Sequence, residues 1–325
     1  MARCCVVGRG FAWRESPAAA GARACNAPHH PPPSAHTVLH PGDSAGAPVP
    51  GGRLVCGQHG WAYALDGRLA AAPRMGGATG FRAADFGLVP AGGAAVWGPI
   101  AFGCVAGRSD YGDAPVPASV AAALAAAGLP MSTADYDLVG RRRFIVRANW
   151  KVVAANFLDG GHHVPFAHPS LASTLDMDTY TSAVFEGGHS LQSVAPRPGP
   201  CGGRAASAAP SLSLYAFLFP CLMLNAYGPW LDANLVRPLG VGETAVDYVW
   251  WVKKSARPAP AAVAAALADS VAVQEEDTLL CASVQAGLGS PGAVPGVYAP
   301  RVETPLHAFH AAVAAAYRRG GLLGG

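Results

Sequence analysis

Charged residues are scarce in this chain, and those present form no long runs. Asp, Glu, Lys and Arg make up 13% of its 325 residues, and the formal net charge is +3. No basic cluster with interleaved aromatic residues occurs, which argues against a nucleic-acid partner. Long apolar runs are also missing, because the alanine-rich stretch 117–128 is too short to span a bilayer and Pro220 breaks the run 214–224. We therefore expect a soluble protein without a membrane span.

The cysteines lack the paired spacing of a disulfide framework. Eight of them are scattered along the chain, which in a protein of this length favours a reducing compartment. Acidic residues are nearly absent from the first fifty positions, where only Glu15 and Asp43 occur. That segment mixes Pro, Ala and His without periodicity, as in HHPPPSAH. We expect residues 1–51 to be irregular, as in a loop, a disordered segment, a targeting peptide or a misassigned first exon.

The rest of the chain divides where its periodicity changes. Residues 52–108 show short strand-like runs separated by glycine turns, which predicts a small β-domain. From 109 to 325 the pattern predicts a helix near 117–127, antiparallel strands between 137 and 254, and a long helix over 258–288. Antiparallel strands that enclose a cavity beneath a long helix form an α+β helix-grip fold.

Two histidines, His163 and His168, follow a predicted helix that carries one apolar stripe. Gly160 and Gly161 should stop that helix, and Pro165 is incompatible with a regular helix beyond it. On a continuous helix the two rings would diverge by roughly 140°, whereas a helix end followed by a broken turn brings them to one point. Neutral imidazole is a ligand for iron, zinc or copper. The alternative is two ordinary hydrogen-bonded histidines.

The long helix supplies a candidate third ligand. Asp277 lies on the apolar stripe that faces the core, whereas Glu275 and Glu276 are expected to point outward. The stripe comprises Val273, Leu280, Cys281, Val284 and Leu288. A buried carboxylate needs a partner or a metal, so the alternative is an aspartate in a salt bridge. Two histidines and one carboxylate form the facial triad of a non-haem iron(II) oxygenase.

These residues stand in segments that resemble one enzyme family. The run NWKVVAANFLDGGHHVPFAH (149–168) is similar to the mononuclear-iron motif of Rieske-type oxygenase large subunits. The run LVCGQHGWAYALDGRL (54–69) resembles the second half of their [2Fe–2S] cluster motif. The similarity continues through 215–240, 274–291 and 298–303. Within the family, the chain is most similar to the choline-oxidising members of the betaine pathway.

The resemblance implies a set of roles and partners. His163, His168 and Asp277 would hold a mononuclear Fe(II), and Asp159 would relay electrons to it. The implied reaction is the hydroxylation of choline to betaine aldehyde or its hydrate, the first step of glycine betaine synthesis, with dioxygen as co-substrate and ferredoxin as electron donor. The implied assembly is a homotrimer or another homo-oligomer, in which one subunit's cluster reduces the next subunit's iron. The implied location is the chloroplast stroma, with the cytoplasm as the alternative.

The cluster motif itself is incomplete. A Rieske centre needs two cysteines and two histidines, which the family places in a C-x-H followed by a C-x-x-H. Cys56 and His59 supply the second pair, and His40 stands where the first histidine belongs, but Val38 occupies the position of its cysteine. Either the cluster is absent, or Cys25 completes it through an irregular loop, or the first fifty residues are not those of the mature protein.

Substrate recognition is expected from aromatic side chains, because a trimethylammonium group over a ring is favoured by ~0.5–2 kcal/mol. The candidates on predicted strands are Tyr215, Phe217, Phe219, Tyr227 and Trp230. Two other functions stay open. One is a Rieske oxygenase of another quaternary-ammonium or aromatic substrate, because pocket shape sets specificity. The other is a non-catalytic ligand binder that has lost its cluster, which Val38 would favour.

Overall fold

The structure is a computed structural model. Of the 325 residues it describes 4–8, 23–24, 53–56, 59–90, 93–104, 116–129, 131–132, 135–197 and 212–322. The chain forms two compact units, Met1–Pro115 and Val116–Gly325. The predicted boundary at residue 108 falls within 105–115, outside the described residues, and stays a prediction.

The N-terminal unit contains short antiparallel strands. β3 (Arg53–Val55), β4 (Ala62–Ala64) and β5 (Leu69–Ala71) form one sheet; β1 (Cys4–Gly8), β8 (Ile100–Cys104) and β7 (Gly93–Trp97) form another; β2 (Arg23–Ala24) pairs with β6 (Val89–Pro90). The strands predicted after residue 52 are therefore present. Within residues 1–51, which were expected to be irregular, the structure describes two short strands, β1 and β2, and the expectation for the segment as a whole stays a prediction. The run CCVVG is apolar and partly β-branched, and this composition suits a paired strand.

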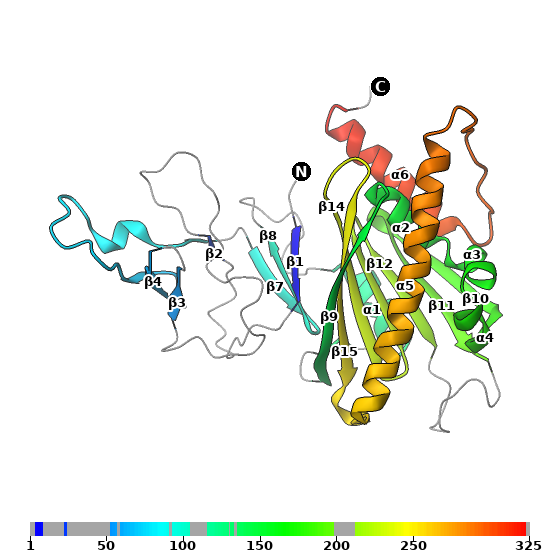
Figure 1. The fold of residues 1–325 in the computed structure, drawn as a ribbon, viewed down its shortest axis with the longest axis horizontal. Helices are drawn as coiled ribbons and strands as arrows, with labels where there is room; N and C mark the ends of the chain where they lie inside the picture. The colour runs from blue at the N-terminus through cyan, green and yellow to red at the C-terminus, as the bar shows by residue number, and fades with distance from the viewer. Residues whose placement is uncertain are drawn as a thin grey trace. The chain divides into compact units, whose positions relative to one another are not determined.

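The C-terminal unit is built on one antiparallel sheet of seven strands, in the order β10-β11-β12-β13-β14-β15-β9 (Figure 1). Their bounds are β9 (Tyr136–Val146), β10 (Leu175–Phe185), β11 (His189–Pro196), β12 (Ser213–Leu218), β13 (Leu222–Tyr227), β14 (Trp230–Pro238) and β15 (Thr244–Lys253). Strands β10 to β15 pair with their neighbours in chain order, and β9 adds to the free edge of β15. Successive side chains of a strand point to opposite faces of the sheet, so each strand contributes side chains to both faces.

Helices pack on this sheet. Their bounds are α1 (Ala118–Ala126), α2 (Trp150–Leu158), α3 (Gly160–Ala167), α4 (Pro169–Thr174), α5 (Pro260–Leu288) and α6 (Thr304–Arg319). The 29-residue α5 crosses the front of the sheet in Figure 1, whereas α1 lies behind it and contacts β11. This arrangement confirms the predicted α+β helix-grip fold. Within the described part of the chain, no helix is both long and apolar enough to cross a membrane.

Two details of the helices differ from prediction. The chain enters α3 directly after α2, and Pro165 lies inside α3. Only eight residues form α3, so the amide that proline lacks costs this short helix a single hydrogen bond, to the carbonyl of Gly161. On α5, Val284 and Leu288 are 52% and 58% exposed. The buried stripe therefore ends near Cys281, and the last turns of α5 face solvent on that side.

The core of this unit lies where α2 and α6 meet the sheet. Phe309 of α6 is fully buried, and its ring centroid lies 5.4 Å from that of Phe217 on β12 and 5.8 Å from that of Trp150 on α2. The apolar stripe predicted for α2 joins the same cluster through Val153, Ala154, Phe157 and Leu158. This packing closes one part of the helix-covered face of the sheet.

Phe309→Ala should lower the free energy of unfolding by about 3–5 kcal/mol, because the vacated volume lies between three packed elements. Urea unfolding followed by fluorescence measures the change. Phe166→Ala is the matched control: Phe166 is 82% exposed, so its truncation should change the free energy by less than about 0.5 kcal/mol. Equal effects of the two substitutions would contradict this account of the core.

Candidate metal centre and substrate cavity

Three short helices in succession bring two histidines together. Asp159 ends α2 and precedes α3, and His163 lies one turn further on. His168 ends α3 with φ −124° and ψ 70° and precedes α4. This non-helical conformation turns the His168 ring away from the direction that a continuous helix would give it. Gly161 lets the segment approach β10 closely, because a Cβ there would overlap the ring of Tyr180.

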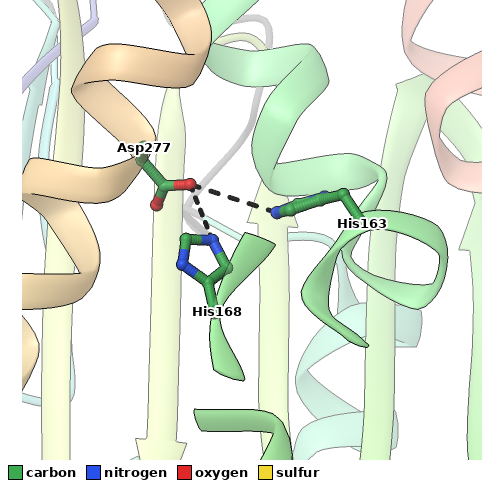
Figure 2. A group of neighbouring side chains, drawn as sticks. All are labelled: His163, His168 and Asp277. Atoms are coloured by element: carbon green, nitrogen blue, oxygen red, sulfur yellow. Dashed lines mark hydrogen bonds and ion pairs between the residues drawn. The ribbon is translucent and has the colours of Figure 1, made fainter. Parts of the chain in front are cut away.

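Asp277 on α5 meets both histidines (Figure 2). Its Oδ1 atom lies 3.0 Å from Nε2 of His168 and 4.0 Å from Nε2 of His163. The candidate ligand atoms of the three residues all lie within 4.8 Å of one another. Asn156 of α2 donates a hydrogen bond of 2.6 Å to the same carboxylate oxygen. The structure thus brings together the three residues singled out in the sequence, with the Nε2 atoms directed at one point.

The other nitrogen of each ring has its own hydrogen-bond partner. Nδ1 of His163 lies 2.9 Å from the backbone oxygen of Asp159, and Nδ1 of His168 lies 2.6 Å from Oε2 of Glu276. A carbonyl or carboxylate oxygen accepts, so each Nδ1 carries a proton. Nε2 of His163 can therefore offer a lone pair, whereas Nε2 of His168 donates to Asp277 here and could offer its lone pair once a metal replaces that proton. Metal-binding histidines are held in this way. The side chain of Glu276, which was expected to point outward, is 40% exposed but also bonds to His168, whereas that of Glu275 is 60% exposed, as predicted.

Burial and neighbouring charge set the protonation of this group. Burial lowers the pKa of His163, and the Asp277 carboxylate only partly opposes the change. Burial also acts to lower the pKa of His168, but hydrogen bonds to Asp277 and Glu276 outweigh it and raise the pKa. His163 is therefore held in the neutral form that binds metals. The two carboxylates at His168 provide the negative charge that a bound cation requires.

The side chain of Asp159 belongs to a second group nearer the surface. Nδ1 of His162 lies 3.8 Å from Oδ1 of Asp159 and 3.5 Å from Oε1 of Glu303. Burial raises the pKa of Asp159 to about 6, and the Glu303 carboxylate adds to the rise. Because its backbone oxygen holds His163, Asp159 connects this outer group to the histidine pair.

A cavity of about 570 Å³ adjoins the histidines, between α5 and the sheet. Its volume lies within the range of about 300–1,000 Å³ that small-molecule sites occupy. His163, His168 and Asp277 form part of its wall, and Asp232 and Asp269 add two further carboxylates. Among the described residues that line it there is no Lys or Arg. The lining of the cavity therefore carries net negative charge unless a bound metal ion compensates for it.

Polar side chains cross the floor of the cavity. Neighbours on β11, β12, β13 and β14 contribute Gln192, Tyr215, Asn225 and Asp232 in one row. Asn225 donates a hydrogen bond of 2.7 Å to Asp232, whose residue is 1% exposed. Burial raises the pKa of Asp232 to about 7, although hydrogen bonds from Asn225, Asn234 and Tyr227 oppose the rise. Neither Asp232 nor Asn225 was singled out in the sequence.

Three of the five predicted aromatic residues line the cavity, namely Tyr215, Tyr227 and Trp230. The structure does not place the other two there. Phe217 and Phe219 pack against Phe309, because α6 covers the part of the sheet where they lie. Phe157 and two tyrosines that the sequence did not point to, Tyr180 and Tyr248, also line the cavity.

The second half of the predicted cluster motif lies on a tight turn of the N-terminal unit. Cys56 is buried, and its backbone amide donates a hydrogen bond of 2.8 Å to the carbonyl of Trp61. His59 is exposed on the same turn. The remaining positions of the motif, Cys25, Val38 and His40, lie outside the described residues, so their roles stay predictions.

Relatives of known name share the sequence features around the site. The family model for the ring hydroxylating alpha subunit (catalytic domain) matches residues 131–319. The chloroplastic choline monooxygenase of Arabidopsis thaliana is 39% identical over 269 residues, which are 79% of this chain and 61% of that protein. The chloroplastic choline monooxygenase of Spinacia oleracea is 31% identical over 263 residues, 79% of this chain and 58% of that protein. The chain thus spans about three-fifths of the length of these curated relatives.

Solved structures share the fold. The quaternary ammonium Rieske monooxygenase CntA in complex with its substrate L-carnitine aligns with a TM-score of 0.68 at 21% identity, over 91% of this chain and 77% of that one. Naphthalene 1,2-dioxygenase from Rhodococcus sp. aligns with a TM-score of 0.59 at 20% identity, over 81% and 75%. The family resemblance stated from the motifs is confirmed. The chain belongs to the ring-hydroxylating alpha subunits, the large subunits of Rieske-type oxygenases, and contains their catalytic domain.

Proposed function

We propose that this protein is the oxygenase component of a ferredoxin-dependent monooxygenase that hydroxylates choline to betaine aldehyde hydrate, the first step of glycine betaine synthesis. The observation that carries the proposal is the convergence of His163, His168 and Asp277 on the wall of an aromatic, electronegative cavity. A choline monooxygenase 39% identical to this chain supports the choice of substrate.

The three converging residues fit a mononuclear Fe(II). Two imidazoles, both neutral once a metal is bound, and one carboxylate are the donor set of the facial triad, which leaves coordination positions open. The hydrogen bonds at the two Nδ1 atoms fix the rings, and Fe(II) would replace the proton that Nε2 of His168 shares with Asp277. When bound, Fe(II) supplies the redox chemistry by which dioxygen is activated beside the substrate.

The overall reaction balances as choline, dioxygen, two electrons and two protons giving betaine aldehyde hydrate and water. The chain's own residues bind and orient the substrate. The rings of Tyr215, Tyr227 and Trp230 face the same cavity as the histidines, so they can hold the trimethylammonium group by cation–π contact, worth ~0.5–2 kcal/mol each. Partial enclosure between α5 and the sheet would limit the access of water to the reacting carbon.

Electron supply follows from the family resemblance. Cys56 and His59 are half of the four ligands that a Rieske cluster needs, and the described residues hold no second pair beside them. His40 is the proposed third ligand. We assign Asp159 as the relay to the iron, in a homotrimer reduced by ferredoxin. The chloroplast stroma is the proposed location, in line with the chloroplastic relatives.

Loss of any one triad residue should abolish iron binding. His163→Ala, His168→Ala and Asp277→Ala should each reduce the iron content of anaerobically loaded protein from about one per chain to near zero, because two donors do not retain Fe(II). Metal analysis after desalting provides the measurement, and Phe166→Ala on the exposed side of α3 is the control. Wild-type iron content in all three variants would show that the assignment is wrong.

Glu276→Ala should weaken Fe(II) binding about 10–100-fold, because His168 loses the carboxylate that orients its ring. Glu275→Ala removes the same charge from the adjacent, exposed position. It should change the affinity less than about twofold. Competition with a fluorescent chelator measures the Fe(II) affinity of both variants. Equal losses of affinity would show that Glu276 acts only through its net charge.

The activity can be tested apart from the cluster, because hydrogen peroxide delivers the oxygen atom and both electrons together. Choline and peroxide should give betaine aldehyde hydrate and water on the Fe(II)-loaded chain, as measured by mass spectrometry. Product from an aromatic acid but not from choline would favour an oxygenase of another substrate. Bound Fe(II) and bound choline without any product would favour the non-catalytic binder.

Asp159→Asn should separate the electron route from the chemistry at the iron. An amide keeps the shape of the carboxylate but not its charge, so ferredoxin-driven turnover should fall about 10–100-fold while peroxide-driven turnover and iron content stay unchanged. The ferredoxin assay compares Asp159→Asn with its parent in a Val38→Cys background, which completes the C-x-H sequence at 38–40. A parallel loss in both assays would indicate structural damage instead of a relay.

A further inference from the structure

We propose that Asp232, at the floor of the cavity, is the specificity-determining residue that selects an organic cation without an anionic group, by supplying the counter-charge for its ammonium. The inference rests on the proposed function for the location of the substrate, but it concerns binding and charge selection and not oxidation.

The position of Asp232 on β14 directs it into the cavity. Alternate residues of this strand, Trp230, Asp232 and Asn234, line the cavity, whereas Leu231 and Ala233 between them are buried on the other face of the sheet. The Asn225 side chain, directly opposite on β13, donates the 2.7 Å hydrogen bond that fixes the carboxylate.

Asp232 has neutral partners only. Asn225, Asn234 and Tyr227 donate hydrogen bonds to it, and in the described part of the chain no Lys, Arg or His forms an ion pair with it. An ionised carboxylate in such a position is costly unless a counter-charge neutralises it. An asparagine would accept the same hydrogen bond from Asn225 without this cost. An ionised Asp232 therefore lacks a counter-charge among the described residues, and a bound cation would supply it.

The surroundings of Asp232 favour one charge type. Tyr215, Tyr227 and Trp230 offer ring faces for an ammonium group. A carboxylate on the substrate would find no Lys or Arg among the described lining residues and would be repelled by Asp232. Burial raises the pKa of Asp232 to about 7, and a cation bound beside it would favour the ionised form and so bind more tightly.

A binding experiment on the full, Fe(II)-loaded chain, without oxygen or reductant, tests the proposal. Calorimetry compares choline with 3,3-dimethylbutan-1-ol, which has carbon in place of the ammonium nitrogen, and with L-carnitine, which adds a carboxylate. The wild type should bind choline at least about tenfold more tightly than either. Asp232→Asn should weaken choline about tenfold or more and change the neutral alcohol less than about threefold, because the hydrogen bond from Asn225 is kept. Glu275→Gln, which removes a charge from the exposed side of α5, should leave both affinities within about twofold.

Each outcome decides the question. Equal weakening of choline and the alcohol by Asp232→Asn would reveal a structural role and overturn the proposal. Equal affinity of the wild type for choline and either analogue would overturn it as well, even if the variant does not fold. Selective, Asp232-dependent binding of choline without its oxidation would leave this inference standing and refute the proposed function.

Discussion

The C-terminal unit depends on one interaction, the meeting of a carboxylate from α5 with two imidazoles that precede it by more than a hundred residues, 109 in the case of His168. Such a group is unfavourable in a buried place unless its charges and hydrogen bonds are complementary. The helices on the two sides of this group, α2 and α5, are therefore each fixed to the rest of the unit. Phe309 holds α2 against the sheet, while Tyr248 and Trp250 of β15 donate hydrogen bonds of 2.7 and 2.9 Å to Gln274 and Ser270 of α5. Donor atoms held by rigid, packed elements form a site before any ligand arrives.

Much of this arrangement follows from local patterns. The spacing around His163 and His168 and the place of Asp277 on an apolar stripe predicted their convergence, because helical periodicity fixes which face a residue occupies. Glu276 was expected to point outward, but it stands only about 100° from Asp277 around the helix. Its long side chain can therefore reach back to His168. Phe217 could not be separated from Tyr215 by alternation, as both occupy the same face of β12. Only α6, nearly a hundred residues later, decides that one is core and the other cavity wall.

The place of Asp232 in the cavity could not be predicted from the sequence for a different reason. The alternation of Trp230, Asp232 and Asn234 with Leu231 and Ala233 is plain in the sequence. A strand with one polar face ordinarily turns that face to water. Here α5 covers it, so residues typical of a solvated surface become the floor of an enclosed cavity. The long helix was predicted, but which face of the sheet it covers is a tertiary fact that no local pattern contains.

In the proposed function, substrate and electrons reach the iron from different sides. The cavity between α5 and the sheet receives the substrate, and an ammonium held on the floor by Asp232 leaves the hydroxyl end of choline free to extend toward the histidines on the wall. Asp159 is turned the other way: its carboxylate faces His162, whose side chain is 57% exposed, while its backbone oxygen holds His163. Two separate approaches allow the substrate side to exclude water while the relay side stays accessible to a reduced partner. In that proposal a single residue, Asp159, would couple the outer surface to His163 without opening the cavity.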